Sequence, residues 1–280
     1  MYRLTALYPQ KRAFITGAGS GFGKALALEL ATDGWTIGLA DLNADRLAET
    51  EQETKQLGGK PIVLPLDVTD KVRFKQISEN FLAQAGGIDV LFNNAGIGDG
   101  GVFELYPLEL WERMIAINQM GVVHGCWFFI PTLKKQKSGM IVNTASFAAV
   151  GAAPEMAAYN MTKAAVTALS ETLYVELMDY NIRVCNVMPG YFQTNIAEGA
   201  STELSRKITQ RRLDKSGLSP QQVAEEVLSR AAEGELYILL PEYAREAWRL
   251  KRENPEQYRM MIKEMMEKER EKHKLINNGQ

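Results

Sequence analysis

The chain has 280 residues, of which 46% are hydrophobic and 24% are charged. These values are close to the averages of globular proteins and exclude a disordered or fibrous chain. Lys and Arg total 32 against 34 Asp and Glu, a net charge of -2. The chain therefore lacks the overall positive field that a dedicated nucleic-acid partner would require.

The cysteines and the apolar segments indicate where the protein resides. Cys126 and Cys185 are the two cysteines, and neither has the spacing of a disulfide framework or a metal site. Residues 1–12 lack the apolar stretch of a signal peptide, and the most apolar window, 121–133, is too short to cross a bilayer. We therefore expect a cytoplasmic protein with reduced thiols, no bound metal and no integral membrane span.

Seven short apolar runs alternate with stretches of helical composition. They cover residues 13–16, 35–40, 62–66, 90–92, 140–144, 182–187 and 236–240. Short strands that alternate with helices form βαβ units, whose strands are parallel and buried on both faces. The pattern predicts a single doubly wound α/β domain over residues 1–241, with a seven-stranded parallel sheet and helices on both faces.

Two segments interrupt this alternation. Residues 191–217 form a long polar insert, which we expect to act as a lid over bound ligands. After the insert, Ser219, Pro220 and Gln222 have the spacing of a helix N-cap, and Gly234 marks the end of that helix. Residues 242–280 carry apolar side chains at helical spacing after Pro255, which predicts a C-terminal helical extension.

A glycine cluster at residues 16–24 follows the first predicted strand. The P-loop pattern fails because Ala18 stands where its first glycine is needed and Ala25 follows the lysine, and the GxGxxG spacing fails as well. The spacing that fits is GxxxGxG, a strand-to-helix turn whose backbone amides can bind a pyrophosphate. We expect a dinucleotide to contact Gly17, Ser20, Gly21, Phe22 and Gly23.

Asp41 ends the second predicted strand, 24 residues after Gly17. An acidic side chain at that position can accept both hydroxyls of an adenosine ribose, and its charge would repel a 2′-phosphate. NAD is therefore expected rather than NADP. Arg46, one helical turn further on, keeps NADP open as the alternative.

The remaining motifs complete a known pattern in chain order. They are Asp67-Val68, Asn93-Asn94-Ala95-Gly96, Asn118, Ser146, Tyr159-Asn160-Met161-Thr162-Lys163 and Pro189-Gly190. With them the chain resembles the short-chain dehydrogenase/reductase family over roughly residues 10–241. The resemblance implies a Rossmann-like fold and an NAD-preferring alcohol dehydrogenase or ketoreductase.

The resemblance also implies a catalytic set of Asn118, Ser146, Tyr159 and Lys163. Tyr159 and Lys163 are four residues apart, so on a helix they would lie on one face with Cβ atoms about 5–6 Å apart. A neighbouring ammonium and a positive nicotinamide would lower the tyrosine pKa from about 10 and make it a general acid/base. In the family pattern, Ser146 orients the substrate oxygen, Asn118 holds a water of the proton relay, and Lys163 also holds the nicotinamide ribose.

Further contacts follow from the same resemblance. The cofactor contacts are Asp67, Val68, Asn94, Ala95, Gly96, Tyr159, Lys163, Pro189, Gly190 and Thr194. The substrate pocket is formed by Ile97, Phe147, Ala148, Met156, Tyr191 and Phe192. None of these pocket residues is charged, and an apolar pocket favours an uncharged substrate with hydrophobic substituents.

The sequence therefore predicts an enzyme that transfers hydride between NAD(H) and an uncharged, hydrophobic secondary alcohol or ketone. Two alternatives stay open: an NADP-dependent ketoreductase of the same fold, and a non-catalytic protein that senses NAD(H) or scaffolds partners. The extension has three interpretations: a helix across the interface of a homodimer or homotetramer, a solvated helix, or a helix on a membrane surface.

Overall fold

The computed structural model describes residues 3–214 and 216–277, without the side chains of Arg3, Leu204, Ile208, Arg212 and residues 269–277. Residue 215 of the predicted insert and residues 278–280 of the predicted extension lie outside this description. At the centre is a parallel sheet in the strand order β3-β2-β1-β4-β5-β6-β7. Its strands are β1 (Arg12–Thr16), β2 (Thr36–Asp41), β3 (Lys60–Pro65), β4 (Val90–Asn93), β5 (Gly139–Thr144), β6 (Ile182–Pro189) and β7 (Tyr237–Leu240).

Every predicted apolar run overlaps one of these strands, so the predicted fold class is confirmed. The α-helices are α1 (Arg3–Leu7), α2 (Gly21–Thr32), α3 (Ala44–Gln56), α4 (Lys71–Ala85), α5 (Leu108–Ile115), α6 (Gly121–Gln136), α7 (Ala148–Gly151), α8 (Ala157–Glu176), α9 (Glu203–Asp214), α10 (Pro220–Glu233), α11 (Glu242–Glu253) and α12 (Pro255–Asn277). Shorter helical turns are η1 (Phe103–Leu105), η2 (Ala116–Met120), η3 (Met178–Tyr180) and η4 (Asn195–Gly199).

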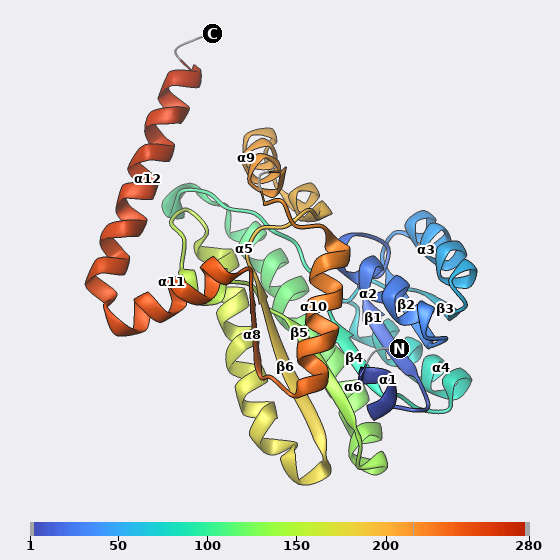
Figure 1. The fold of residues 1–280 in the computed structure, drawn as a ribbon. Helices are drawn as coiled ribbons and strands as arrows, with labels where there is room; N and C mark the ends of the chain where they lie inside the picture. The colour runs from blue at the N-terminus through green and yellow to red at the C-terminus, as the bar shows by residue number, and fades with distance from the viewer. Residues whose placement is uncertain (1–2, 215, 278–280) are drawn as a thin grey trace.

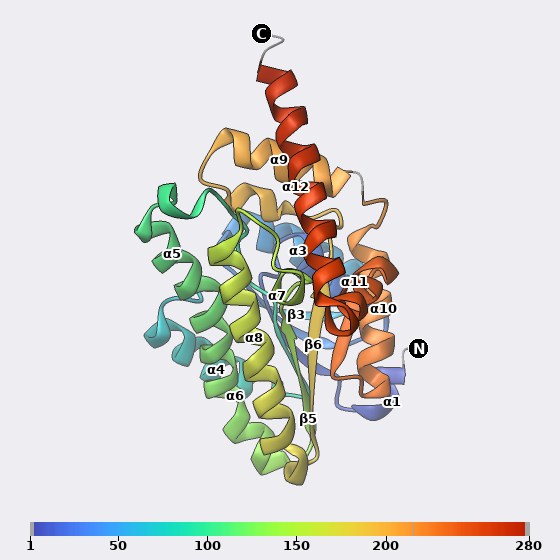
Figure 2. The same cartoon turned by 90° about the vertical axis from the view of Figure 1, so that its left-hand side faces the viewer.

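Helices cover both faces of the sheet, with α4, α6 and α8 on one side and α1 and α10 on the other (Figure 2). Neighbouring residues of a strand therefore join different cores. Phe14 of β1 packs against Phe81 of α4 and Phe129 of α6, with ring centroids 5.3 and 4.7 Å apart. The next residue, Ile15, belongs to the core beneath α2 and α10. This alternation explains why the strands read as continuous apolar runs.

One helical stretch of the described residues, Leu108–Gln136, is long and apolar enough to cross a membrane by length and composition. It comprises α5, η2 and α6, and α6 lies against the sheet (Figure 2). Phe129 and Leu133 of α6 are completely buried in the sheet core. This packing buries part of its apolar surface, whereas other apolar side chains, such as Trp127, are exposed.

The strand order reverses between β1 and β4, and this reversal determines where ligands can bind. In open α/β sheets, the crevice lies at the carboxyl ends of the strands where the chain turns to opposite sides. The glycine turn after β1, the segment after β4 and the segment after β5 meet at this edge. The sequence motifs identified above lie on these segments.

The insert and the extension are both helical. The insert contains η4 and α9, and the extension consists of α11 and α12. Helix α11 packs against α7 and β7, whereas α12 extends away from the body of the protein (Figure 1). The predicted helical extension is therefore confirmed.

The N-cap of α10 provides a first test of this architecture. The Ser219 hydroxyl accepts the Gln222 amide, and the Gln222 side chain accepts the Ser219 amide, as the spacing predicts. Ser219→Ala should lower the free energy of unfolding by about 1 kcal/mol, measured by urea denaturation. Ser219→Asp keeps a capping oxygen and is the control, so equal losses in both variants would contradict this account.

Candidate active site

The glycine turn after β1 has the geometry of a dinucleotide cradle. Gly17 has a positive φ of 69°, which glycine adopts without strain. A side chain on Gly23 would collide with the carbonyl oxygen of Gly17, so helix α2 can begin here only with glycine. Gly21 begins α2, and Thr194 of the insert lies against it, because a Cβ on Gly21 would be 3.5 Å from the Thr194 Cβ.

Hydrogen bonds from the segment after β4 hold this turn in place. The Thr16 hydroxyl accepts the backbone amides of Asn94 and Ala95 at 2.9 and 3.0 Å. The Asn94 side chain donates to the carbonyl oxygens of Thr16 and Gly17. The predicted cofactor residues Asn94 and Ala95 therefore meet the glycine turn through Thr16. Thr16 is not among the site residues predicted from the sequence.

Asp41 lies beside the glycine turn at the end of β2. Its carboxylate accepts the Gly19 amide at 2.9 Å and the Asn43 amide at 2.9 Å. Each carboxylate oxygen has a second lone pair, so the side chain, which is partly exposed, can still accept ribose hydroxyls. Its position fits the predicted contact with the adenosine ribose.

Ser146, Tyr159 and Lys163 meet at the carboxyl ends of β5 and β6. Tyr159 and Lys163 lie on α8, and the Lys163 ammonium is 5.7 Å from the centre of the Tyr159 ring. Lys163 donates to the carbonyl oxygen of Thr144 at 2.9 Å. The Ser146 hydroxyl accepts the Ala148 amide at 3.1 Å and contacts the carbonyl oxygen of Pro189 at 3.4 Å.

Burial dominates the protonation of this pair. It raises the pKa of Tyr159 to about 12, although the Ser146 hydroxyl acts in the opposite direction. It also lowers the pKa of Lys163 to about 8. The low tyrosine pKa expected from the sequence is therefore not found in this structure, because loss of solvent disfavours the phenolate.

Asn118 lies in a stretch where the helix widens. Helices α5 and α6 are joined here by η2, a π-helical turn, and such turns are frequent at functional sites. The Asn118 amide donates to the Ile97 carbonyl and the Thr162 hydroxyl, while its oxygen accepts the Ile97 amide. Gly96 separates it from Lys163, since a Cβ there would lie 3.2 Å from the Asn118 oxygen and 3.4 Å from the Lys163 ammonium.

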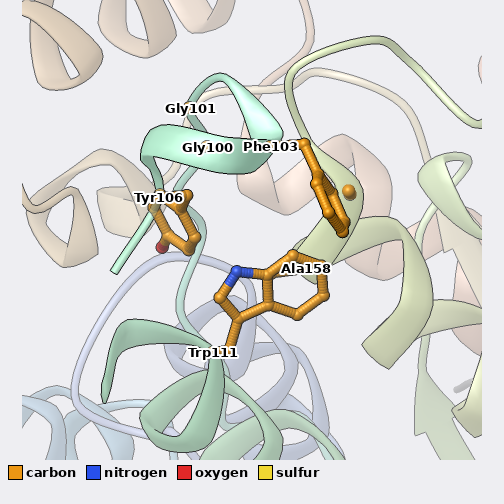
Figure 3. A pocket seen from close by; sticks show the side chains of 7 residues that line it. Gly100, Gly101, Phe103, Tyr106, Trp111 and Ala158 are labelled. Atoms are coloured by element: carbon orange, nitrogen blue, oxygen red, sulfur yellow. The ribbon is translucent and has the colours of Figure 1, made fainter. Parts of the chain in front are cut away.

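An uncharged cluster surrounds the Tyr159 ring. It contains Ile97, Tyr106, Trp111, Met114, Ala148, Met156, Ala158 and Ile196. A shallow hollow lies beside it, lined by Phe103, Tyr106, Trp111, Ala157, Ala158 and two glycines (Figure 3). The aromatic residues of this hollow were not predicted, because they belong to a loop and helix that carry no family motif.

The structure distributes the predicted pocket residues unevenly. Ile97, Ala148 and Met156 lie in the cluster around Tyr159, and the Tyr191 hydroxyl contacts the Met156 sulfur at 3.9 Å. Phe147 faces Tyr243 of the extension, with ring centroids 6.3 Å apart. Phe192 is not brought into this cluster, because it packs against Phe22 of the glycine turn at 5.9 Å.

The other predicted cofactor residues lie at the same sheet edge. Asp67 is exposed and accepts the Thr69 amide and hydroxyl. Val68 is buried against α6, where His124 contacts its carbonyl oxygen at 2.8 Å. Pro189 ends β6, and the Gly190 amide donates to the carbonyl oxygen of Leu240.

Asp99 connects the insert to the segment after β4. This carboxylate, 4% exposed, accepts the backbone amides of Gly100 and Ser201 and the hydroxyls of Tyr106 and Ser205. Burial acts to raise the pKa of Asp99, but these four donors together lower it below its ordinary value. The insert is therefore attached to the body by a buried charge.

A second tie joins the insert to the nucleotide end of the site. Arg46 of α3 pairs with Glu198 of η4 at 2.9 Å, with 35% and 53% of the two side chains exposed. This pair directs the Arg46 guanidinium toward a carboxylate. Arg46 also lies close to Asp41, since a Cβ on Gly19 would lie 3.0 Å from both residues.

The fold and this site together define a nucleotide-dependent oxidoreductase of the doubly wound class. The model of the short chain dehydrogenase family matches residues 11–205. The chain belongs to this family and is an oxidoreductase that uses NAD(P)(H).

Several known proteins resemble the chain over most of its length. A 3-oxoacyl-[acyl-carrier-protein] reductase from Thermotoga maritima is 33% identical over 232 residues, covering 81% of this chain and 93% of the relative. A short-chain dehydrogenase/reductase from Burkholderia phymatum, solved with NAD, has a TM-score of 0.83 and 32% identity, with 88% and 94% coverage. An alcohol dehydrogenase from the archaeon Thermococcus sibiricus, solved with 5-hydroxy-NADP, has a TM-score of 0.73 and 28% identity, with 82% and 95% coverage.

Removing the charge of Asp99 tests the attachment of the insert. Asp99→Asn should lower the free energy of unfolding by about 1.5–3 kcal/mol at pH 7, because an amide cannot accept from all four donors. The pKa of Asp99 is lower in the folded protein than in the unfolded chain, where it is about 3.9, so its charged form stabilises the fold above that pH. This stabilisation is lost as the pH falls through the folded-state pKa. The difference in the free energy of unfolding between the wild type and Asp99→Asn, measured by urea denaturation, should therefore become smaller below pH 4.

Asp179→Asn, on the surface after α8, is the matched control. Limited proteolysis of both variants reports on the insert directly. Faster cleavage within residues 191–217 is expected in Asp99→Asn alone. A loss of stability in Asp99→Asn that stayed constant from pH 7 to pH 3 would contradict the charged interaction.

Proposed function

We propose that this protein is an NAD-dependent alcohol dehydrogenase or ketone reductase whose general acid/base is Tyr159. The observation that carries the proposal is the burial of Tyr159 beside Lys163 and Ser146, inside an uncharged cluster. NAD, when bound, takes up or supplies the hydride. Residues 1–241 form the catalytic unit, and the insert closes over it as a lid.

The protein residues act on the proton and on orientation. The Ser146 hydroxyl binds the substrate oxygen and directs it toward the Tyr159 hydroxyl, which gives the proton to a ketone or takes it from an alcohol. Lys163 supports the phenolate through its charge and binds the nicotinamide ribose. Asn118 holds a water that connects Lys163 to solvent, and the π-helical turn supports its unusual position.

The cofactor preference rests on the nucleotide end of the site. Gly17, Ser20, Gly21, Phe22 and Gly23 bind the pyrophosphate, and Asp41 binds the adenosine ribose. Asp41 would repel a 2′-phosphate, and the nearby Arg46 pairs with Glu198. The Burkholderia relative was solved with NAD, which agrees with this preference, whereas the Thermococcus relative keeps NADP as the alternative.

The substrate is an uncharged secondary alcohol or ketone with hydrophobic substituents. The hydrophobic side chains of the cluster around Tyr159 favour such substituents. The buried charged groups next to it, Lys163 and Asp99, already bond to the Thr144 carbonyl and to four donors, respectively. A panel of acetone, 2-octanone, acetophenone, pyruvate and acetoacetate, with NADH and NADPH, tests this class. Turnover of the two carboxylates alone would overturn it.

The setting of the enzyme is part of the same proposal. We place it in the cytoplasm. We also propose that it is a homodimer or homotetramer, because several large apolar side chains are exposed on its helices. They include Trp127 of α6, Val175 of α8 and Met265 of α12, at 73%, 68% and 57% exposure. Surfaces of this kind are typical of contacts between subunits.

Tyr159→Phe separates catalysis from cofactor binding. The variant keeps the ring but lacks the proton, so kcat with 2-octanone should fall by about 10²-fold or more. The dissociation constant of NADH, measured by fluorescence titration, should stay within about twofold of the wild-type value. Tyr180→Phe, on the surface near the end of α8, is the control. Wild-type kcat in Tyr159→Phe would refute the mechanism and leave the sensor alternative.

Asp41→Asn tests the cofactor preference. Loss of the charge should lower the ratio of kcat/KM for NADH to that for NADPH by about tenfold, because the repulsion of the 2′-phosphate is removed. Asp45→Asn removes an exposed charge one turn along the same segment and should leave the ratio within about twofold. An unchanged ratio in Asp41→Asn would refute the role assigned to Asp41.

A further inference from the structure

Helix α7 follows Ser146 and has little intrinsic stability. It contains four residues, Ala148–Gly151, and such a short helix is not stable by itself. Beyond it, Ala152 and Glu155 have positive φ values of 50° and 60°, which are unfavourable for residues with a side chain. This segment therefore needs contacts from elsewhere to keep one conformation.

Two residues of the extension supply such contacts at the carboxyl end of α7. The Lys251 ammonium donates to the carbonyl oxygen of Val150 at 2.6 Å. The Tyr258 hydroxyl donates to the carbonyl oxygen of Gly151 at 2.6 Å, and Tyr258 is 4% exposed. The last carbonyl groups of a helix lack partners within the helix, and a cation is favourable at this end.

A third residue, Tyr243, lies against the start of the same segment. Its ring packs edge-on against Phe147, which directly follows Ser146. Its hydroxyl accepts the backbone amide of Tyr191 at 3.3 Å. Tyr243 thus contacts both the segment after β5 and the start of the insert.

These contacts lead to Ser146 through α7. The Ala148 amide at the start of α7 donates to the Ser146 hydroxyl, and the Ala148 side chain belongs to the cluster around Tyr159. Figure 2 shows α11 and the first turns of α12 beside α7. A displacement of α7 would therefore move both the Ser146 hydroxyl and one wall of the substrate site.

We propose that Lys251 and Tyr258 are positioning residues, which fix α7 and thereby hold Ser146 and the pocket wall in register with Tyr159. Tyr243 supports the same segment through its contact with the Phe147 ring. The extension is thus a part of the active site of its own subunit, through contacts that require no second chain. This inference rests on the proposed function only for its kinetic consequence, because the contacts themselves exist without it.

The experiment compares Lys251→Met and Tyr258→Phe in the full chain, with Lys251→Arg as the conservative variant. Met keeps the length of the side chain without its charge, and Phe keeps the ring without its hydroxyl. Lys263→Met is the control, because Lys263 is an exposed lysine of α12 that pairs with Glu267 on the same helix. Urea denaturation verifies that all of the variants are folded.

Two readouts are measured. The first is hydrogen–deuterium exchange of the amides of residues 149–152, which bond within α7 and the turn before it. The second is the kinetics of 2-octanone reduction with NADH. Lys251→Met and Tyr258→Phe should exchange these amides about fivefold faster or more, and their kcat should fall by a similar factor. The dissociation constant of NADH should not change, and Lys251→Arg and Lys263→Met should behave like the wild type.

The outcomes separate this inference from the proposed function. Wild-type exchange and wild-type kcat in both variants would overturn the positioning role while leaving Tyr159 as the acid/base. Faster exchange with unchanged kcat would also overturn it, because α7 would then move without consequence. If the wild type reduces no ketone of the panel, the proposed substrate class fails, and unchanged exchange alone would still overturn the inference.

Discussion

The hydrogen bonds that join the ends of β1 and β4 underlie the rest of the site. Thr16 at the end of β1 accepts two amides from the segment after β4, and Asn94 returns two hydrogen bonds to the glycine turn. These two strands are neighbours at the point where the strand order reverses. These partly buried hydrogen bonds therefore fix the positions of both the glycine turn and the backbone that leads to Gly96. Asn118 and Lys163 lie against Gly96.

Tyr159 and Lys163 are placed where their charged forms are unfavourable. Both side chains are buried, at 7% and 3% exposure, and burial moves their pKa values in opposite directions, toward the neutral forms. The protonation states of Tyr159 and Lys163 are consequently sensitive to the charge and polarity of any ligand that binds in the site. Such an arrangement suits a proton transfer that should proceed only when ligands are bound, because an isolated phenolate in this environment is strongly disfavoured.

Local patterns in the sequence predict the strands, the cap of α10, the glycine turn and the pairing of Tyr159 with Lys163, because each depends on residues close together in the chain. The ties of the insert could not be predicted in the same way. Arg46 and Glu198 are 152 residues apart, and Asp99 bonds to residues 102 and 106 positions away. Such pairs leave no periodicity, and the π-helical turn at Asn118 looks like ordinary helix in a hydropathy pattern. The effect of burial on Tyr159 also requires the packed structure.

The contacts of the extension have a consequence for how this enzyme can diverge. The family model matches residues 11–205, so Tyr243, Lys251 and Tyr258 lie outside the residues that it matches. Substitutions in this appended segment can reshape the wall beside Ser146 while every motif residue stays the same. The carboxyl terminus thus offers positions at which substrate preference and turnover can change while the nucleotide contacts stay the same.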